Sequence, residues 1–527
     1  MGELHKLLLT TSGTGSRLGE STSYTNKCLV RVGEKPAISH ILDLYDENLE
    51  VVVTLGHFGH LVKDFLLISY PNRKFTFVEI DKYEGEGSSL GYSLLKAKKY
   101  LNCSFIFHAC DTLPFGRVPL PIFNWLGGTK RSDGSHYRTL NVSGGIVSKI
   151  NEKGELDYDY DYIGLAGIYD HELFWNALEA EYNLNKNNSQ LSDCHAINKM
   201  MQIHDNLFEL REFPEWQDIG NITSLNRARE KVKNSFTVLD KDDESIYLVD
   251  KKIIKFFSNA EVCKNRIARS SVLQPLTPKI LKYSDNFYSY DYISGNLFSQ
   301  SVNTKSFKKF LNWADKELWI KTSESNGKFY DTCREFYFNK TKTRVDSFLS
   351  KNNVIDEPNI INGLSVPSVK DMLSDIDEKW FCDVSSYQYH GDFILDNIIE
   401  TSDAFKLIDW RQDFGGDINN GDIYYDLAKL NHNLVVSHDI IHKDLYDIDI
   451  KSNEIKCDIL RKNTLVECQK IFDQFCLKNE YDLTKVRVLS AIIWLNMSAL
   501  HHYPFNVFLF NFGKYNLCKY LSERSLS

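Results

Sequence analysis

Short apolar runs alternate with amphipathic stretches through the first part of this 527-residue chain. The runs LHKLLLTT, LEVVVTLGHF, KFTFVEI and CSFIFHACDTL begin at residues 4, 49, 74 and 103, and helical patterns come between them. Strands that alternate with helices predict a doubly wound α/β domain with a parallel sheet. Ligands of such sheets bind at the carboxyl ends of the strands.

The first apolar run leads directly into a glycine-rich stretch, SGTGSRLGE. Glycines after a strand let the backbone approach a ligand closely, so the N–H groups around Gly13, Gly15 and Ser16 can cradle phosphate oxygens. Arg17 and Lys27 would add positive charge for a triphosphate. A glycine loop alone is as often a surface turn, and its weight therefore depends on what lies beside it.

Two further features fall at the same predicted edge of the sheet. The loop EGEGSSLG, with Gly87 and Ser88, follows the third run, and Asp111 ends the fourth. Because the carboxyl ends of parallel strands meet at one edge, these features and the first glycine loop are expected to converge. The convergence makes the prediction of a phosphate-binding site at this edge a strong one.

A charged segment, REKVKNSFTVLDKDDES, changes the composition of the chain near residue 230. We place a domain boundary there, with domains at 1–229 and 230–527, since the chain exceeds what one core usually holds. After it, SIYLVDKKIIKFF alternates like a small antiparallel hairpin. Residues 305–385 have the pattern of helices with polar connections, so the second domain is expected to be α+β.

The stretch YHGDFILDNIIETSDAFKLIDW, residues 389–410, carries carboxylates at a spacing that suits phosphoryl transfer. One carboxylate must orient the attacking hydroxyl and accept its proton, and oxygen ligands must hold Mg²⁺ against the phosphates. Asp392, Asn397 and Asp409 supply these parts if the second strand folds back on the first. The alternative is a polar hairpin with solvated acids, and Asp396 is expected to be such a solvated neighbour.

Composition excludes several other classes of protein. A formal charge of −9, with no concentrated basic stretch, argues against nucleic acid as a partner. The 11 cysteines have no CxxC or metal-ligand spacing, which indicates reduced thiols. No apolar run is long enough to insert into a membrane and no signal-peptide pattern is present, so a cytoplasmic protein is expected.

Residues 5–228 resemble the nucleotidyltransferases that condense a nucleoside triphosphate with a sugar phosphate or phosphocholine. The resemblance rests on GTGSRL, Lys27, EGEGSSLG, HACDTL and WQDIGN. It implies that Asp111 and Asp218 hold Mg²⁺, that Arg17 binds the leaving pyrophosphate, and that Lys27 bridges the reacting phosphates. The alternative for Asp218 is a helix N-cap.

This first half also departs from the pattern of those enzymes. Their usual proline before the lysine is Asn26 here, and their LAAG opening is LTTSG. These departures leave the nucleotide base open. His57 and His108 are expected to be structural.

Residues 389–410 resemble the catalytic core of the aminoglycoside phosphotransferase and choline kinase family, whose pattern is HGDxxxxN followed by IDW or IDF. The resemblance implies a protein-kinase-like domain with Asp392 as the catalytic base and with Asn397 and Asp409 as the Mg²⁺ ligands. Asp426 is expected to be structural.

The same resemblance extends to the start of the second domain. Lys255 looks like the kinase lysine that contacts the α- and β-phosphates, and Glu261 is its candidate partner. The alternative for Glu261 is an acid that favours the first turn of a helix. The stretch NFYSYDYISGNLF resembles the kinase hinge, whose backbone would contact adenine around Tyr290 and Tyr292.

Together the two halves predict a bifunctional enzyme. The second domain would phosphorylate a small alcohol with ATP, and the first would couple the phosphate to an NMP unit, with CTP as the first choice. The product would be an NDP-activated precursor for surface polysaccharide or lipopolysaccharide. The alternatives are an anomeric sugar kinase joined to a sugar-1-phosphate nucleotidyltransferase, or a regulatory binding protein with one degenerate half.

Overall fold

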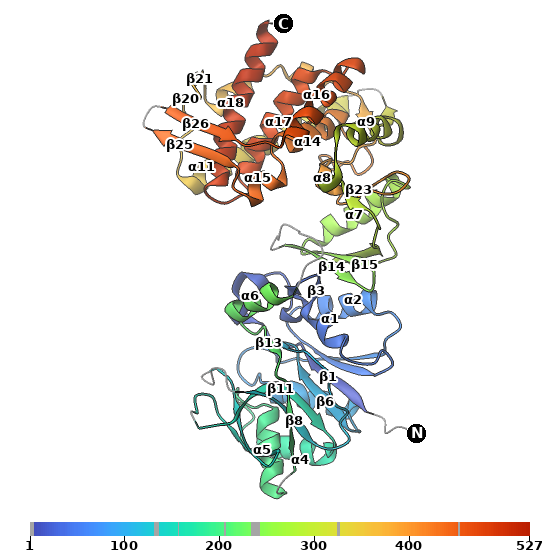
Figure 1. Ribbon diagram of the computed structural model, residues 1–527, viewed down its shortest axis with the longest axis vertical. Helices are drawn as coiled ribbons and strands as arrows, with labels where there is room; N and C mark the ends of the chain where they lie inside the picture. Colours follow the sequence, from blue (N-terminus) through green and yellow to red (C-terminus); the bar gives the residue numbers. More distant parts are fainter. Residues whose placement is uncertain are drawn as a thin grey trace. The chain divides into compact units, whose positions relative to one another are not determined.

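The structure is a computed structural model that describes residues 5–130, 136–155, 157–204, 207–232, 243–323, 327–451 and 454–526 (Figure 1). The chain forms two compact units. The first comprises Met1–Ala260 and Leu281–Tyr292, and the second comprises Glu261–Ile280 and Ile293–Ser527.

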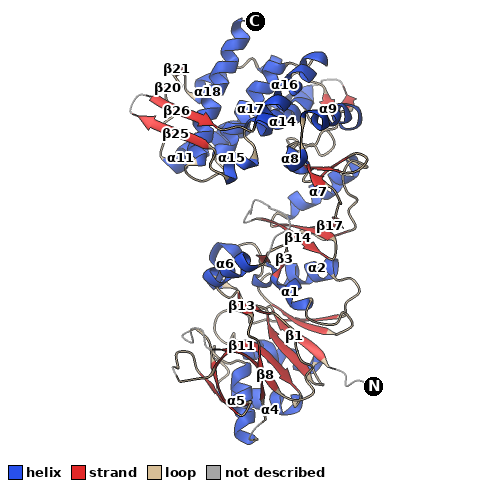
Figure 2. Ribbon diagram, in the orientation of Figure 1, coloured by secondary structure: helices blue, strands red, loops and turns tan. Residues whose placement is uncertain are grey.

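A nine-stranded sheet forms the centre of the first unit (Figure 2). In spatial order its strands are β5 (Phe75–Glu79), β4 (Val51–Leu55), β1 (Lys6–Thr10), β6 (Phe105–Ala109), β11 (Tyr160–Ile168), β8 (Trp125–Lys130), β12 (Glu209–Glu212), β10 (Ile146–Asn151) and β9 (Thr139–Ser143). Strands β5, β4, β1 and β6 are parallel, as predicted. The prediction of a parallel sheet is wrong for the rest, because β11 runs antiparallel to both β6 and β8.

Helices cover both faces of this sheet, which confirms the doubly wound arrangement. They are α1 (Ala37–Leu42), α2 (Gly59–Ser69), α3 (Leu90–Ala97), α4 (His171–Leu184) and α5 (Asp193–Ile203). Side chains alternate along a strand, and β1 accordingly sends Leu7 and Leu9 into one core and Leu8 into the other. The first core contains Phe65 of α2, and the second contains Trp175 of α4.

A four-stranded antiparallel sheet follows in the chain. Its order is β14 (Glu244–Val249), β15 (Lys252–Phe257), β17 (Phe287–Asp291) and β16 (Lys282–Tyr283). Tyr247, Phe256 and Phe287 of this sheet join the core that contains Phe65, and the Tyr247 hydroxyl donates to the Leu29 carbonyl at 2.8 Å. The predicted hairpin is therefore present, but it packs within the first unit. The first compact unit accordingly continues past residue 230 to Ala260 and also takes in Leu281–Tyr292, while residues 233–242 of the predicted linker lie outside the described residues.

The second unit is mainly helical (Figure 2). Its helices are α7 (Ala260–Val272), α8 (Phe298–Ser301), α9 (Thr304–Trp313), α10 (Gly327–Arg334), α11 (Lys340–Asn352), α12 (Val369–Ser374), α13 (Glu378–Cys382), α14 (Ile423–Val435), α15 (His438–His442), α16 (Asn463–Lys478), α17 (Leu483–Ser498) and α18 (Phe505–Leu526). Short π-helical turns, η4 (Ala314–Leu318) and η5 (Glu335–Asn339), follow α9 and α10. Helix α17 is buried along most of its length and packs against α14 and α18.

Small sheets complete this unit. They are β18 (Asn296–Leu297) with β23 (Ile398–Glu400) and β24 (Phe405–Leu407), then β19 (Lys321–Ser323) with β22 (Ser386–Tyr387), and β21 (Leu364–Val366), β20 (Asn359–Ile361), β26 (Glu454–Ile459) and β25 (Tyr446–Lys451) in that order. The helices expected over 305–385 are present, but β19, β20 and β21 interrupt them. Over the described ranges, no helix combines the length and the apolar character that a membrane span requires.

Candidate active sites

The glycine loop of the first unit begins at the carboxyl end of β1, as predicted. Gly13 is exposed, and a Cβ placed there would meet no other atom within 4 Å. Gly15 has φ +68°, a left-handed conformation that favours glycine. After it, Ser16 and Arg17 begin the short 3₁₀ segment η1 (Ser16–Thr22), and both are exposed. The loop therefore leaves backbone open at its tip.

Asn26 holds the far end of this loop in place. Its amide nitrogen donates to the carbonyl oxygens of Thr11 at 2.8 Å and His57 at 2.6 Å, and its Oδ1 accepts from Cys28 N at 2.9 Å. The side chain is fully buried. An asparagine at this position thus ties the loop to the ends of β1 and β4, and it fixes the backbone that carries Lys27.

Lys27 and Asp111 form an ion pair with 3.1 Å between Nζ and Oδ2. Burial alone would lower the pKa of Lys27, but the charge of Asp111 outweighs it and the pKa is raised. Burial would raise the pKa of Asp111, and the charges of Lys27 and Arg17 instead hold it below its ordinary value. Both groups are therefore ionised, and each is about one-fifth exposed.

A two-stranded pairing brings Asp218 to the same place. Strands β7 (Thr112–Pro114) and β13 (Trp216–Asp218) are antiparallel, with Asp218 opposite Thr112, and Ile219 N donates to the Asp111 carbonyl at 3.0 Å. Tyr137 donates its hydroxyl to Asp218 Oδ2 at 3.1 Å. The N-cap of α6 (Ile222–Lys231) is Asn221, so the helix-cap alternative for Asp218 is wrong.

Gly220 marks the point on which three predicted site residues converge. A Cβ added there would lie 3.0 Å from Asp218 Oδ1, 3.3 Å from Arg17 Nη2 and 3.4 Å from Asp111 Oδ2. Carboxylate oxygens from two elements that face one space are the donor set that Mg²⁺ takes, completed by waters and substrate phosphates. The residues present therefore fit the implied metal. The described residues contain no group of three or more His, Cys, Asp or Glu side chains that could hold a metal by themselves.

The second glycine loop lies beside the first. A Cβ on Gly56, which follows β4, would collide with the Ser12 carbonyl oxygen and lie 2.7 Å from the Tyr83 Cβ, so the chain ends of β1, β4 and β5 meet closely. Gly87 has φ +80°, and Ser88 donates its hydroxyl to the Gly85 carbonyl at 2.7 Å. Both precede α3, whose N-cap is Ser89. His108 is structural, since its ring contacts Thr112 O at 2.9 Å and the Tyr45 hydroxyl at 2.7 Å.

In the second unit, Asp392 and Asn397 are in direct contact. Asn397 Nδ2 donates to Asp392 Oδ2 at 3.0 Å and to the Asp392 carbonyl at 2.9 Å. Lys429 on α14 lies 2.7 Å from Asp392 Oδ1. Burial opposes the charge of Lys429, but Asp392 raises its pKa, so the pair is ionised. The two contacts engage both carboxylate oxygens of Asp392 and fix the orientation of its side chain.

The β23–β24 hairpin places Asp409 near this pair of residues. Ile398 lies opposite Leu407, and Ile408 N donates to the Asn397 carbonyl at 2.9 Å, so the strand that precedes Asp409 folds back as expected. Asp409 has φ +58°, which is uncommon for a residue other than glycine and is found where function or local structure requires it. Arg266 approaches Asp409 Oδ1 at 3.4 Å. Asp396 is not simply solvated, because His438 lies 3.3 Å from its Oδ2.

A buried acid fixes the backbone of the same loop. Asp426 accepts the N–H groups of His390 and Gly391, both at 2.7 Å, and also the indole N–H of Trp319 at 3.2 Å. Burial raises the pKa of Asp426 to about 6. Its role is structural, as expected.

The residues predicted for the ATP site are divided between the two units. Lys255 is buried in β15, Tyr290 is buried in β17, and Tyr292 is exposed at the last position of the first unit. Glu261 is exposed at the start of α7 in the second unit. Because Lys255 and Glu261 belong to different compact units, their pairing stays a prediction.

Sequence reasoning missed several side chains that contact the acids. Lys429 stands in YYDLAKL, and its position three residues after Asp426 puts both on the same side of α14. Tyr137 gave no signal, because its contact with Asp218 spans 81 residues. Lys340 and Arg344, one turn apart on α11, do not contact the acids but line a cavity beside Lys429, and the charged sequence around them gave no signal of this.

No family model matches the chain, and no curated protein matches it. Solved structures do match its N-terminal part. The CTP:phosphocholine cytidylyltransferase of Streptococcus pneumoniae is 20% identical over 43% of this chain and 98% of that chain, with a TM-score of 0.35. The inositol-1-phosphate CTP transferase of T. maritima is 18% identical over 44% and 98%, with a TM-score of 0.34. A UDP-glucose pyrophosphorylase from Acinetobacter is 16% identical over 43% and 92%, with a TM-score of 0.36.

Proposed function

We propose that the first unit is a nucleotidyltransferase. The observation that carries this proposal is the convergence of Asp111, Asp218 and Arg17 around Gly220, with Lys27 paired to Asp111. Two carboxylates can hold a divalent cation while two cationic side chains neutralise phosphate oxygens. All four side chains lie at the carboxyl edge of the parallel strands, where nucleotides bind.

The reaction joins the substrate's phosphate to the α-phosphorus of the nucleoside triphosphate. The bond from the attacking phosphate oxygen to the α-phosphorus forms, the bond to the β-phosphate oxygen breaks, and pyrophosphate leaves. Lys27 would hold the reacting phosphates, and Arg17 would stabilise the charge that develops on the leaving pyrophosphate. The loop at Gly13 and the loop at Gly87 and Ser88 would position the nucleotide, so positioning and charge neutralisation supply most of the rate.

Mg²⁺ bound by Asp111 and Asp218 would neutralise charge on the triphosphate. The ion pair of Lys27 with Asp111 keeps that carboxylate ionised at neutral pH, which a metal ligand requires. Tyr137 and the Gly220 N–H hold the two oxygens of Asp218 in place, at 3.1 and 2.9 Å. A ligand held in this way does not have to be ordered when substrate arrives.

We infer that the second unit carries a phosphotransferase site for a hydroxyl group. This inference is supported by the contacts of Asp392 with Asn397 and Lys429 and by the return of the chain to Asp409. Asp392 would accept the proton of the attacking hydroxyl, and Asn397 and Asp409 would bind Mg²⁺. The ATP contacts of Lys255, Tyr290 and Tyr292 and the pairing of Lys255 with Glu261 stay predictions from the sequence, because the first three residues belong to the first unit.

The two reactions fit one sequence. ATP would phosphorylate a small alcohol, and the resulting phosphate would attack a second nucleoside triphosphate, with CTP as the first choice, to give an NDP-alcohol for surface polysaccharide or lipopolysaccharide. A sugar kinase paired with a sugar-1-phosphate nucleotidyltransferase is the alternative. The retention of acids in both units weighs against a regulatory protein with one inactive half.

Mass spectrometry of products tests the proposal. The full-length protein is supplied with ATP, with CTP, GTP, UTP and dTTP in turn, and with Mg²⁺ and a panel of small alcohols and their phosphate esters. We expect ADP and phospho-alcohol from one half-reaction, and pyrophosphate and NDP-alcohol from the other. Absence of both pyrophosphate and ADP across the panel would contradict the proposal.

A further inference from the structure

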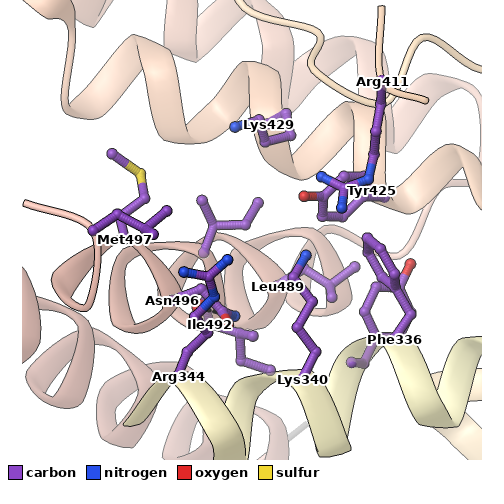
Figure 3. A pocket seen from close by; sticks show the side chains of 13 residues that line it. Phe336, Lys340, Arg344, Arg411, Tyr425, Lys429, Leu489, Ile492, Asn496 and Met497 are labelled. Atoms are coloured by element: carbon purple, nitrogen blue, oxygen red, sulfur yellow. Dashed lines mark hydrogen bonds between the residues drawn. The ribbon is translucent and has the colours of Figure 1, made fainter. Parts of the chain in front are cut away.

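A cavity of about 150 Å³ lies in the second unit next to the Asp392–Lys429 pair. Its walls come from η5 and α11 on one side, the segment after β24 and α14 on another, and α17 on a third (Figure 3). Figure 3 shows Lys340 and Arg344 pointing from α11 into the same space as Lys429 and Arg411. The cavity is therefore a place where basic side chains from three segments converge.

The lining carries an excess of positive charge. Lys340, Arg344, Arg411 and Lys429 contribute to it, and no Asp or Glu side chain does. Within the described ranges, Lys340 and Arg344 have no carboxylate at ion-pair distance, whereas Lys429 is paired with Asp392 and Arg411 donates Nε–H to the Asp413 carbonyl at 3.0 Å. Burial, and then the charges of Arg411, Lys429 and Arg344, lower the pKa of Lys340 to about 6. Lys340 is therefore largely neutral at pH 7 in the free protein, and a bound anion would relieve the repulsion among these basic groups and favour its charged form.

The aromatic residues of the cavity do not form a cage for a cation. Lys340 Nζ lies 4.0 Å from the centre of the Phe336 ring and 5.9 Å from that of Tyr425, and Arg411 Cζ lies 5.0 Å from the Phe336 ring. These rings already contact the protein's own cations. A quaternary ammonium ligand needs open aromatic faces, and it would also meet four basic groups.

We propose that this cavity binds the anionic group, a carboxylate or a phosphate ester, of the alcohol that the second unit phosphorylates. Lys340, Arg344 and Arg411 would hold the anion, and Lys429 would link this subsite to the base Asp392. A cavity of this volume holds a molecule about the size of benzene, so the acceptor would have roughly six to ten non-hydrogen atoms. The proposal rests on the phosphotransferase function proposed above and names its substrate class.

The chemistry balances with this acceptor. A hydroxyl oxygen of the anionic alcohol forms a bond to the γ-phosphorus of ATP, the bond between that phosphorus and the β–γ bridging oxygen breaks, and ADP leaves. The hydroxyl proton passes to Asp392. The carboxylate or phosphate ester of the acceptor takes no part in bond making. Its role is to place the hydroxyl, which is how binding energy remote from the reacting atoms accelerates a reaction.

The test compares four probes of similar size with the full-length protein: glycerol 3-phosphate, glycerate, glycerol and choline. ADP formation gives kcat/KM for each, and calorimetry with the non-hydrolysable ATP analogue present gives the affinity for each. We expect at least one anionic probe to exceed glycerol and choline by about 10-fold or more in kcat/KM, as a charge-assisted contact implies. The two anionic probes separate a carboxylate preference from a phosphate preference.

Variants identify the cavity as the origin of that preference. Lys340→Met and Arg344→Met should each lower kcat/KM for the preferred anion about 10-fold or more, and with it most of the preference over glycerol. Lys340→Arg, which keeps a basic group at this position, should retain much of the kcat/KM that Lys340→Met loses. Lys342→Met is the matched control, because Lys342 is exposed on the same helix and does not line the cavity.

The outcomes separate this proposal from the function on which it rests. Anion binding that depends on Lys340 and Arg344, without any ADP formation, would support the subsite and contradict the phosphotransferase. Phosphorylation of glycerol or choline at least as efficient as that of the anions would support the phosphotransferase and overturn the subsite. Equal affinity for all probes, or no binding of either anion, would also overturn it.

Discussion

Each unit contains a lysine–aspartate pair, but the two pairs differ in what surrounds them. Lys27 and Asp111 are joined by Arg17 and Asp218 at Gly220, so two acids and two bases share one space. Lys429 and Asp392 adjoin a cavity with three further basic groups and no acid in its lining. The balanced site suits a metal together with phosphates, whereas the unbalanced one leaves negative charge to be supplied by a ligand. Charge that the protein leaves uncompensated thus indicates the ligand more specifically than a motif does.

Separate substitution of Asp111 and Asp392 should have the largest expected effects and should distinguish the two units most clearly. Asp111→Ala should lower nucleotidyl transfer by about 10³-fold or more and leave ATP-dependent phosphorylation of the alcohol intact, because metal and phosphate positioning is lost in one unit alone. Asp392→Ala should do the reverse, since the base is lost there. Pyrophosphate and ADP release, measured in parallel, check both.

A mixture of the two variants provides the control for folding and for autonomy. With ATP, CTP and alcohol supplied together, the mixture should form NDP-alcohol because each protein retains one activity. If each variant kept its own activity and the mixture still formed no product, the intermediate would have to remain within one chain.

A buried neutral histidine next to each acid should make both units acid-labile. Burial lowers the pKa of His108 and that of His390 to about 4 each, although the carbonyls of Thr112 and Ile408 partly oppose it. In the unfolded chain an imidazole has a pKa of about 6.5. Between these values the unfolded state binds more protons, so the free energy of unfolding falls as pH falls from 6.5 to 4, by up to about 3 kcal/mol for each group.

Urea unfolding at several pH values between 7 and 4.5 measures this dependence. His108→Asn and His390→Asn should each flatten it while lowering stability at pH 7. His60→Gln, at an exposed position on α2, should leave the slope unchanged. A slope that neither buried substitution alters would mean that other groups cause the acid lability.

The sequence predicted the parts of each site that lie within one motif. Asp392 and Asn397 are five residues apart and are in contact, and Asp409 follows a strand whose return could be expected from FKLIDW. It could not predict that the hairpin at Tyr247 packs on α2. Apolar alternation indicates which face of a strand is buried, but not which element covers that face. Nor did it predict that strand β11 is antiparallel, because an apolar run does not indicate whether its strand runs parallel or antiparallel to its neighbours. Contacts over many residues, such as Tyr137 with Asp218, follow from the tertiary fold.

Gly220→Ala should test whether Asp218, Arg17 and Asp111 act together in the space beside Gly220. Its Cβ would enter between Asp218 Oδ1, Arg17 Nη2 and Asp111 Oδ2 at 3.0 to 3.4 Å. These atoms end flexible side chains, so the fold can adjust, but the donor geometry cannot stay as it is. We expect about a 10-fold loss of nucleotidyl transfer, equivalent to ~1.4 kcal/mol, with little change in stability. Gly327→Ala, which meets no atom within 4 Å, is the control. Full activity of the Gly220 variant would place the reacting groups elsewhere.

Asn221 and Asp218 should separate a capping role from a catalytic one, and the Asn221 variants should have the smallest effects of the series. Asn221 Oδ1 accepts Ser224 N at 3.0 Å and caps α6, whereas Asp218 lies in β13 before the helix. Asn221→Ala should cost about 1 kcal/mol of stability and Asn221→Ser almost nothing, since serine caps as well as asparagine does. Neither should reduce nucleotidyl transfer more than about 3-fold, because only a 3.4 Å contact joins Asn221 to Asp218 Oδ2. Asp218→Asn should instead leave the unfolding midpoint nearly unchanged and remove most of the activity. Urea unfolding and pyrophosphate release are measured in parallel on the three variants. If Asp218→Asn lowered stability and the Asn221 variants removed the activity, Asp218 would be the structural residue.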